Sequence, residues 1–293
     1  MPRAALLSIH ARVAGTKPSA WEDASLVQLW GPRYSVYVVA KRDLAIFSLG
    51  RLPEAGATRR VAEDMATRLD SLLQGARMTY HEAGDALGVH PNRLRYAALT
   101  GRVVIRWEGA RAPVVWTVPP PDLDPGAARL ELARRYLHIF GPTTPTAFAR
   151  WAGIGAREGA SAFDALARTL TAVQTPVGDA WILSREEPAF RATGPAAPAR
   201  LLPSGDAYFL LQGADRELLV PDAARRSELW TSRVWPGALL VDGEVVGTWR
   251  RADATLTVQP WRRLARNERD AVEAEAAVLP LPGMEGRIVV RWD

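Results

Sequence analysis

The 293-residue chain contains no cysteine, and Lys17 and Lys41 are its only lysines. Without cysteine there are no disulfide bonds and no thiolate metal sites. Nearly all of the 37 basic residues are therefore arginines. Arginine presents a planar set of donors that suits phosphate groups and guanine edges. The formal net charge of +5 is by itself only weak evidence for a nucleic-acid partner.

Several patterns that identify common protein classes are also missing. No apolar run reaches the roughly 18 to 20 residues of a membrane helix, and the first residues show no secretory signal pattern. The nucleotide-binding patterns GxGxxG and GxxxxGK[ST] and the hydrolase pattern GxSxG do not occur. The four histidines lack the spacing of a zinc site. We therefore expect no metal, no cofactor and no membrane partner, and a location in the cytoplasm.

Two proline-rich joints divide the chain, one at Pro119–Pro121 and the other from Gly194 to Pro203. Consecutive prolines interrupt both helices and β ladders. These joints and the repeat described next predict four parts. They are residues 1–60, 61–121, 122–194 and 195–293.

Segments 61–118 and 126–183 form a repeat with an offset of 65 residues. Each segment has a possible helix N-cap, then a glycine that closes a short helix before another helix, and finally a tryptophan in an apolar run. A glycine between two helices is typical of a helix-turn-helix, and a hairpin after it is typical of a winged helix. The matched pairs are Thr79 and Thr144, Gly88 and Gly153, and Trp116 and Trp181.

Apolar periodicity and turn residues predict the individual elements. In the repeats we expect helices at Pro91–Leu99 and Ala156–Leu170, and hairpins at 103–107 with 114–116 and at 172–173 with 180–182. Residues 1–60 are interpreted as a partial third copy. Its helices are predicted at Ala4–Val13, Trp21–Leu29 and Arg42–Leu49, and its strand at Tyr34–Val39. Residues 195–293 are expected to form a small β-barrel-like domain with one helix, Leu264–Val278, and strands at 208–211, 217–220, 238–241, 244–249, 255–260 and 287–292. The predicted fold class is α+β, with tandem winged-helix domains (helix-turn-helix plus β wing) before this C-terminal domain.

Several motifs resemble the AlkZ/YcaQ-type winged-helix DNA glycosylases. The matching stretches are Pro2–Ser8, Leu29–Arg33, Gly141–Pro145, Leu201–Pro203 and Gly247–Arg250. This resemblance implies three tandem winged helices, a β barrel and the excision of alkylated or cross-linked purines in base-excision repair. It also implies a monomer that binds damaged double-stranded DNA.

The family's catalytic motif is a glutamine, an apolar residue and a second glutamine or an aspartate, located just before the stretch that Pro2–Ala5 matches. Here that stretch begins at Met1, so the motif is absent and no catalytic residue is assigned. We expect an incomplete N-terminus. The alternatives are a non-catalytic winged-helix protein such as a transcriptional regulator, and a protein-interaction scaffold. Candidate DNA contacts, chosen from predicted helix-turn-helix and wing positions or from the resemblance, are Arg3, His10, Arg12, Arg33, Tyr34, Arg93, Arg95, Arg102, Arg106, Arg157, Asp206, Arg216, Trp249 and Arg250.

Overall fold

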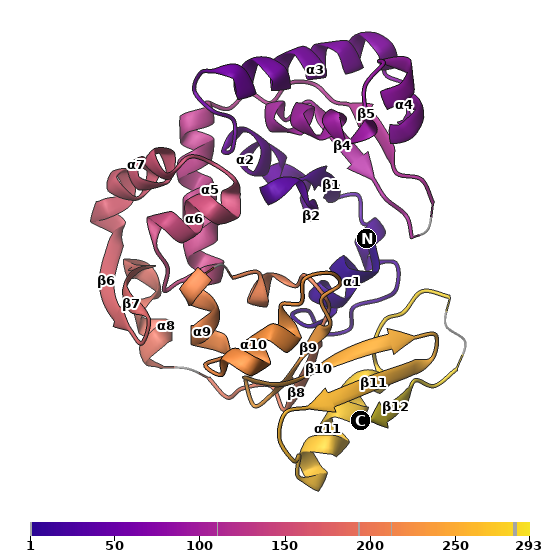
Figure 1. The fold of residues 1–293 in the computed structure, drawn as a ribbon, viewed down its shortest axis with the longest axis vertical. Coiled ribbons are helices and arrows are strands. Elements are labelled where there is room, and N and C mark those ends of the chain that lie inside the picture. Colours follow the sequence, from indigo (N-terminus) through magenta and orange to yellow (C-terminus); the bar gives the residue numbers. More distant parts are fainter. Residues whose placement is uncertain (1, 110, 193, 212, 284–285) are drawn as a thin grey trace. The chain divides into compact units, whose positions relative to one another are not determined.

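The computed structural model describes residues 2–109, 111–192, 194–211, 213–283 and 286–293, and contains both helices and strands (Figure 1). Contacts within the chain define two compact units. The first consists mainly of residues 22–175 and 179–187, and the second mainly of residues 3–21 and 188–293. Among the described residues, no helix has the length and apolarity needed to cross a membrane. The two units are described separately below.

The first unit opens with an antiparallel hairpin of β1 (Leu26–Trp30) and β2 (Val36–Ala40), followed by α2 (Leu44–Leu49). The predicted helix Trp21–Leu29 is therefore wrong. A short apolar run fits a strand as well as a helix, and here pairing with the valine-rich β2 decides in favour of the strand. Leu29 and Trp30 are buried as a result.

The first repeat contains α3 (Ala57–Leu73), β3 (Met78–Thr79), α4 (Tyr80–Ala86), the 3-10 helix η4 (Pro91–Thr100) and the hairpin β4 (Val103–Arg106)–β5 (Val114–Thr117). The Thr79 side chain accepts a hydrogen bond from the Glu82 backbone amide, which confirms the predicted N-cap. Figure 1 shows α3 and α4 lying beside this hairpin.

The second repeat contains α5 (Pro125–Phe140), α6 (Pro145–Ala152), α7 (Ala156–Leu166) and the hairpin β6 (Leu170–Thr175)–β7 (Gly178–Leu183). Thr144 caps α6 through the Ala147 amide, as predicted. Gly88 and Gly153 both have a positive φ, 65° and 73°, which glycine adopts without steric penalty. The repeated sequences thus have corresponding helices, turns and hairpins.

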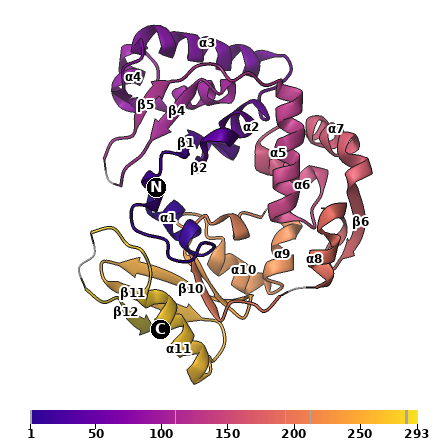
Figure 2. The same ribbon diagram turned by 180° about the vertical axis from the view of Figure 1, so that it is seen from behind.

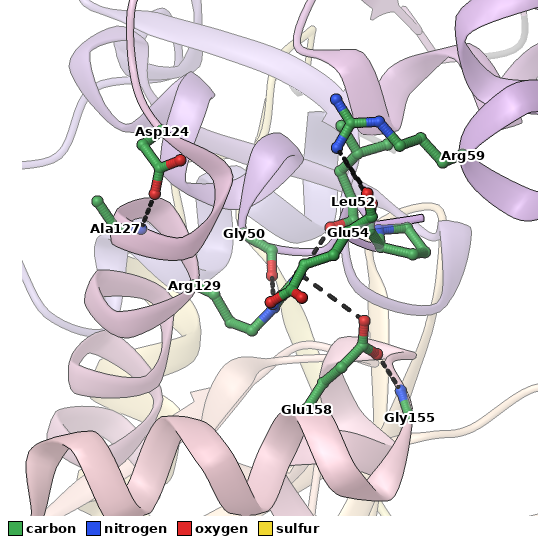
Figure 3. A network of polar contacts seen from close by, with 10 residues as sticks. Gly50, Leu52, Glu54, Arg59, Asp124, Ala127, Arg129, Gly155 and Glu158 are labelled. Carbon is green, nitrogen blue, oxygen red and sulfur yellow. Dashed lines mark hydrogen bonds and ion pairs between the residues drawn. The ribbon is translucent and has the colours of Figure 1, made fainter. Parts of the chain in front are cut away.

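Arg129 of α5 connects the second repeat to the residues that follow α2 (Figure 3). Its buried guanidinium donates from Nε to the Gly50 carbonyl at 3.3 Å and from Nη2 to the Leu52 carbonyl at 2.6 Å. Glu54 and Glu158 lie within ion-pair distance of the same group, at 3.5 and 3.8 Å. One buried cation therefore holds three segments of the first unit together.

The second unit is built on a five-stranded sheet of order β12-β11-β10-β9-β8. The strands are β8 (Ala199–Leu202), β9 (Gly237–Val241), β10 (Glu244–Ala252), β11 (Thr255–Pro260) and β12 (Val289–Trp292). In the described residues β8 and β12 form the two separate edges of this sheet. The sheet is therefore open, and the predicted barrel-like closure is wrong. Helix α11 (Arg266–Ala277) packs on the sheet and matches the predicted helix (Figure 2).

Two predicted strands of this unit are also wrong. Residues 207–209 form a 3-10 turn capped by Asp206, and Arg216–Leu219 is the short helix α9, followed by α10 (Ala223–Leu229). Asp206 accepts an amide hydrogen bond at the start of the 3-10 turn, and Asp222 does so at the start of α10; such side-chain caps favour helical turns over strands. Helix α9 has no side-chain cap. The first helix of the chain, α1 (Pro2–His10), contributes Leu7 to the core of this unit.

Candidate nucleic-acid interface

The turn between β1 and β2 has an unusual backbone. Arg33 and Tyr34 both lie in the left-handed region, with φ of 56° and 58°, which is sparsely populated by residues with a side chain. The Gly31 amide donates to Ser35 at 2.8 Å and the Tyr34 amide donates to Gly31 at 2.9 Å, so the turn is internally bonded. Backbone strain of this kind occurs frequently at functional sites.

Arg51, which follows α2, supports this turn from the interior. Only 2% of the residue is exposed. Its Nη1 donates to the Trp30 carbonyl and its Nε donates to the Ala152 carbonyl, both at 2.9 Å. Burial lowers the pKa of Arg51 to about 10, so the group is still a cation near neutral pH. Its hydrogen-bond partners in the described structure are carbonyls, and no carboxylate there pairs with it.

Tyr34 lies at the centre of a cluster of cations and aromatic rings. The guanidinium carbons of Arg51 and Arg95 are 5.2 and 5.1 Å from its ring centroid. The Tyr96 ring meets it edge-on at 5.2 Å, and the Arg95 guanidinium also lies 5.7 Å from the Tyr96 ring. Partial burial raises the pKa of the Tyr34 hydroxyl, with the nearby arginines acting in the opposite direction. We call Tyr34, Arg51, Arg95 and Tyr96 the tyrosine–arginine cluster.

The other predicted contacts of the first unit fall into two groups. Arg33, Arg93 and Arg157 are exposed, and no ion pair is found for them among the described residues. Arg102 pairs with Asp70 at 3.0 Å, and Arg106 pairs with Glu108 at 2.8 Å. A paired arginine has part of its charge compensated, so the first group offers the stronger attraction for phosphate.

In the second unit, Arg12 and Asp206 bind each other. Nη1 and Nη2 of Arg12 donate to the two Asp206 oxygens at 2.9 and 2.8 Å, and Asp206 is completely buried. This bidentate hydrogen bonding raises the pKa of Arg12. His10 has its Nε2 3.8 Å from Glu275. Asp206 therefore acts as a partner for Arg12 and a helical cap, with no free carboxylate edge.

The remaining predicted contacts have mostly structural surroundings. Arg216 stacks on Trp230 and Trp235, with distances of 4.9 and 5.6 Å to the ring centroids. Trp249 is 6% exposed and its indole N–H donates to the Leu202 carbonyl. Because its ring lies in the core, we leave Trp249 out of the proposed contacts. Arg250 is exposed and donates to the Val234 carbonyl at 2.9 Å, and the side chain of Arg3 lies outside the described residues.

Sequence reasoning missed Arg51 and Tyr96. Nothing in the sequence separates Arg51 from the many other arginines, because its partners are backbone carbonyls of distant residues. Tyr96 carried one usable signal, since it directly follows the predicted contact Arg95. Among the described residues, no three histidine, aspartate or glutamate side chains are placed to hold a metal ion.

Comparisons with known proteins agree with this description of the fold. The sequence model of a family described as "DNA glycosylase AlkZ-like" matches residues 1–279. An "Interstrand DNA cross-link repair glycosylase" of Streptomyces sahachiroi is 26% identical over 268 residues, which cover 81% of this chain and 70% of that protein. The solved structure of the Streptomyces sahachiroi DNA glycosylase AlkZ has a TM-score of 0.76 at 22% identity, covering 99% of this chain and 90% of that chain. The chain therefore belongs to the AlkZ-like DNA glycosylase family.

Proposed function

We propose that this protein binds damaged double-stranded DNA as a monomer and releases alkylated or cross-linked purines by hydrolysing their N-glycosidic bonds. The observation that carries the proposal is the family match over residues 1–279. The cross-link repair named for the Streptomyces sahachiroi relative supports the choice of lesion. We place this activity in the cytoplasm, on the nucleoid.

The repeated segments support a DNA partner. Each has a capped short helix, a turn glycine, a further helical segment and a hairpin, which is the order of elements in a winged helix. We propose that these are tandem winged helices, whose helices enter a groove while the hairpins lie along the backbone. Exposed arginines that have no ion pair within the described part of the chain, such as Arg93, would supply the phosphate contacts.

The chemistry places limited demands on the protein. A purine that carries an extra alkyl group on a ring nitrogen is positively charged and is already a good leaving group. An amide or carboxylate that positions water and stabilises the positively charged sugar would then suffice. We assign this role to no residue of the chain.

The proposal is tested by incubating the protein with duplexes that contain an N7-alkylated guanine or an interstrand cross-link. Alkali converts abasic sites to strand breaks, which are resolved on denaturing gels. We expect breaks at the damaged position and none in the undamaged duplex of the same sequence. Binding with no breaks on any alkylated purine would contradict the enzymatic role. A sharp consensus selected from random duplexes would then support a non-catalytic regulator.

A further inference from the structure

The tyrosine–arginine cluster carries a positive charge that the described structure does not neutralise. Other arginines of the same unit have carboxylate partners: Arg102 with Asp70, Arg106 with Glu108 and Arg135 with Asp43, at 2.8 to 3.0 Å. Arg51 and Arg95 have none among the described residues, although both lie within about 5 Å of the Tyr34 ring centroid. Both cations lie beside the same ring, and a local excess of positive charge favours the binding of an anion next to it.

Arg95 provides the cluster with hydrogen-bond donors that have no partner among the described residues. Arg51 uses Nε and Nη1 on the carbonyls of Ala152 and Trp30. The Nε of Arg95 is buried and has no partner among the described residues, whereas its two terminal nitrogens are not buried in this way. The inner side of this guanidinium thus lies against aromatic rings, while the outer edge can reach a ligand. That edge presents two parallel N–H donors, which suit a phosphate group.

The surroundings also restrict the motion of these groups. Arg95 lies over both Tyr34 and Tyr96, and Arg51 is held by two backbone carbonyls. The turn that presents Tyr34 is internally hydrogen-bonded. A guanidinium that is already oriented loses less conformational entropy when it binds than a free surface arginine does.

From these observations we propose that Arg95, oriented by Tyr34 and Tyr96 and assisted by the charge of Arg51, binds a phosphate of the DNA backbone. The inference rests on the proposed DNA-binding function and adds a defined contact to it. A contact of this kind positions the duplex and reads no sequence. It therefore suits a protein that recognises damage in any sequence context.

The test is the salt dependence of duplex binding, measured by fluorescence anisotropy between roughly 50 and 200 mM NaCl. Loss of one phosphate contact reduces the slope of log K against log salt by about 0.9. We expect this reduction in Arg95→Gln, with weaker binding at low salt. The matched control is Arg134→Gln, which removes a partly exposed arginine paired with Glu131 at 3.2 Å. The control is expected to keep the wild-type slope.

Further variants keep the test decisive. Tyr34→Phe retains the ring and is expected to keep the wild-type slope, whereas Tyr34→Ala lowers affinity. If Arg95→Gln fails to fold by circular dichroism, Arg95→Lys replaces it. That variant keeps the charge and loses the paired donors, so we expect the wild-type slope with lower affinity at every salt concentration.

The outcomes also separate this inference from the function on which it rests. A folded Arg95→Gln protein with the wild-type slope and affinity overturns the phosphate site alone, and so does an Arg95→Lys protein with wild-type affinity. Failure of the wild-type protein to bind any duplex at low salt overturns the proposed DNA-binding function itself. Inorganic phosphate can also be added at constant ionic strength. If it binds at Arg95 while Arg95→Gln leaves the slope of log K against log salt for duplex binding unchanged, the site binds free phosphate and the proposal is overturned.

Discussion

The two repeats have corresponding elements but carry different charges on the helical segment that follows the turn glycine. Segment η4 of the first repeat contains Arg93 and Arg95 and no acidic residue, for a charge of +2. Helix α7 of the second repeat contains Arg157, Glu158 and Asp164, which sum to −1. DNA attracts the first segment more strongly than the second, because the charge of α7 together with Arg168 in the 3-10 turn Ala167–Thr169 sums to zero.

The second repeat instead has a large aromatic interior. The ring of Tyr136 lies 5.0 Å from that of Trp151 and 5.4 Å from that of Phe148. It also supplies Arg129, which binds the segment after α2 (Figure 3). We infer that the first repeat contacts DNA and that the second acts mainly as its support. The predictions below test this division, beginning with the largest expected effect.

Arg129→Ala should be the most destabilising change. It leaves the carbonyls of Gly50 and Leu52 without their buried donor, and each unsatisfied buried acceptor costs about 1–3 kcal/mol. Urea unfolding followed by circular dichroism measures the difference. Arg134→Ala, on the exposed side of the same helix, should change the free energy of unfolding by less than about 1 kcal/mol. Equal effects of the two variants would show that α5 does not have this supporting role.

A close helix contact distinguishes the second repeat from the first. A Cβ atom at Gly159 would lie 2.8 Å from the Ala149 Cβ and from the Pro145 carbonyl, whereas at Gly84 of the first repeat the nearest atoms are at 3.0 Å. Gly159→Ala is expected to lower the free energy of unfolding by roughly 1–3 kcal/mol through overpacking. Gly84→Ala should have a smaller effect, because its contact is milder and the gain in helix propensity of about 1 kcal/mol, which both variants share, offsets more of it. Thermal unfolding of both variants measures the difference. A larger loss of stability in Gly84→Ala than in Gly159→Ala would contradict this prediction.

Removing either N-cap should lower the free energy of unfolding by a similar amount at neutral pH and by different amounts in acid. Thr79→Ala and Thr144→Ala each remove one side-chain cap, at about 1 kcal/mol. Glu82 takes part in the Thr79 cap, and its hydrogen bond from the Thr79 hydroxyl holds the pKa of Glu82 below its usual value of 4.5. That contribution is present above pH 4.5 and is lost as the pH falls through the lowered pKa. The effect of Thr79→Ala should therefore shrink in acid, while that of Thr144→Ala stays constant; parallel pH profiles would contradict this.

Much of the first unit could be predicted from the sequence because its signals are local. The caps at Thr79 and Thr144, the turn glycines and the apolar runs of both hairpins depend on neighbouring residues. The strand β1 could not be recognised, because its identity depends on pairing with β2. The helical turn at 207–209 had a local signal that the prediction did not use, the Asp206 cap, whereas the helix at 216–219 has no side-chain cap to mark it.

The sequence predicted some residues of the candidate site and missed others. Arg33, Tyr34, Arg93 and Arg95 could be chosen from their places in motifs. Whether an arginine is paired depends on contacts between distant residues, as for Arg102 with Asp70 or Arg12 with Asp206. Arg51 escaped notice for the same reason, since its partners are Trp30 and Ala152.

The division between the repeats is tested most directly by comparing Arg93→Gln with Arg157→Gln, two exposed arginines near the start of η4 and α7. Both variants lose one positive charge, so an effect of net charge alone would change the slope of log K against log salt equally in both. We predict that Arg93→Gln reduces the slope of log K against log salt by about 0.9 and that Arg157→Gln leaves it unchanged. Equal slopes in the two variants, or a loss confined to Arg157→Gln, would contradict the account.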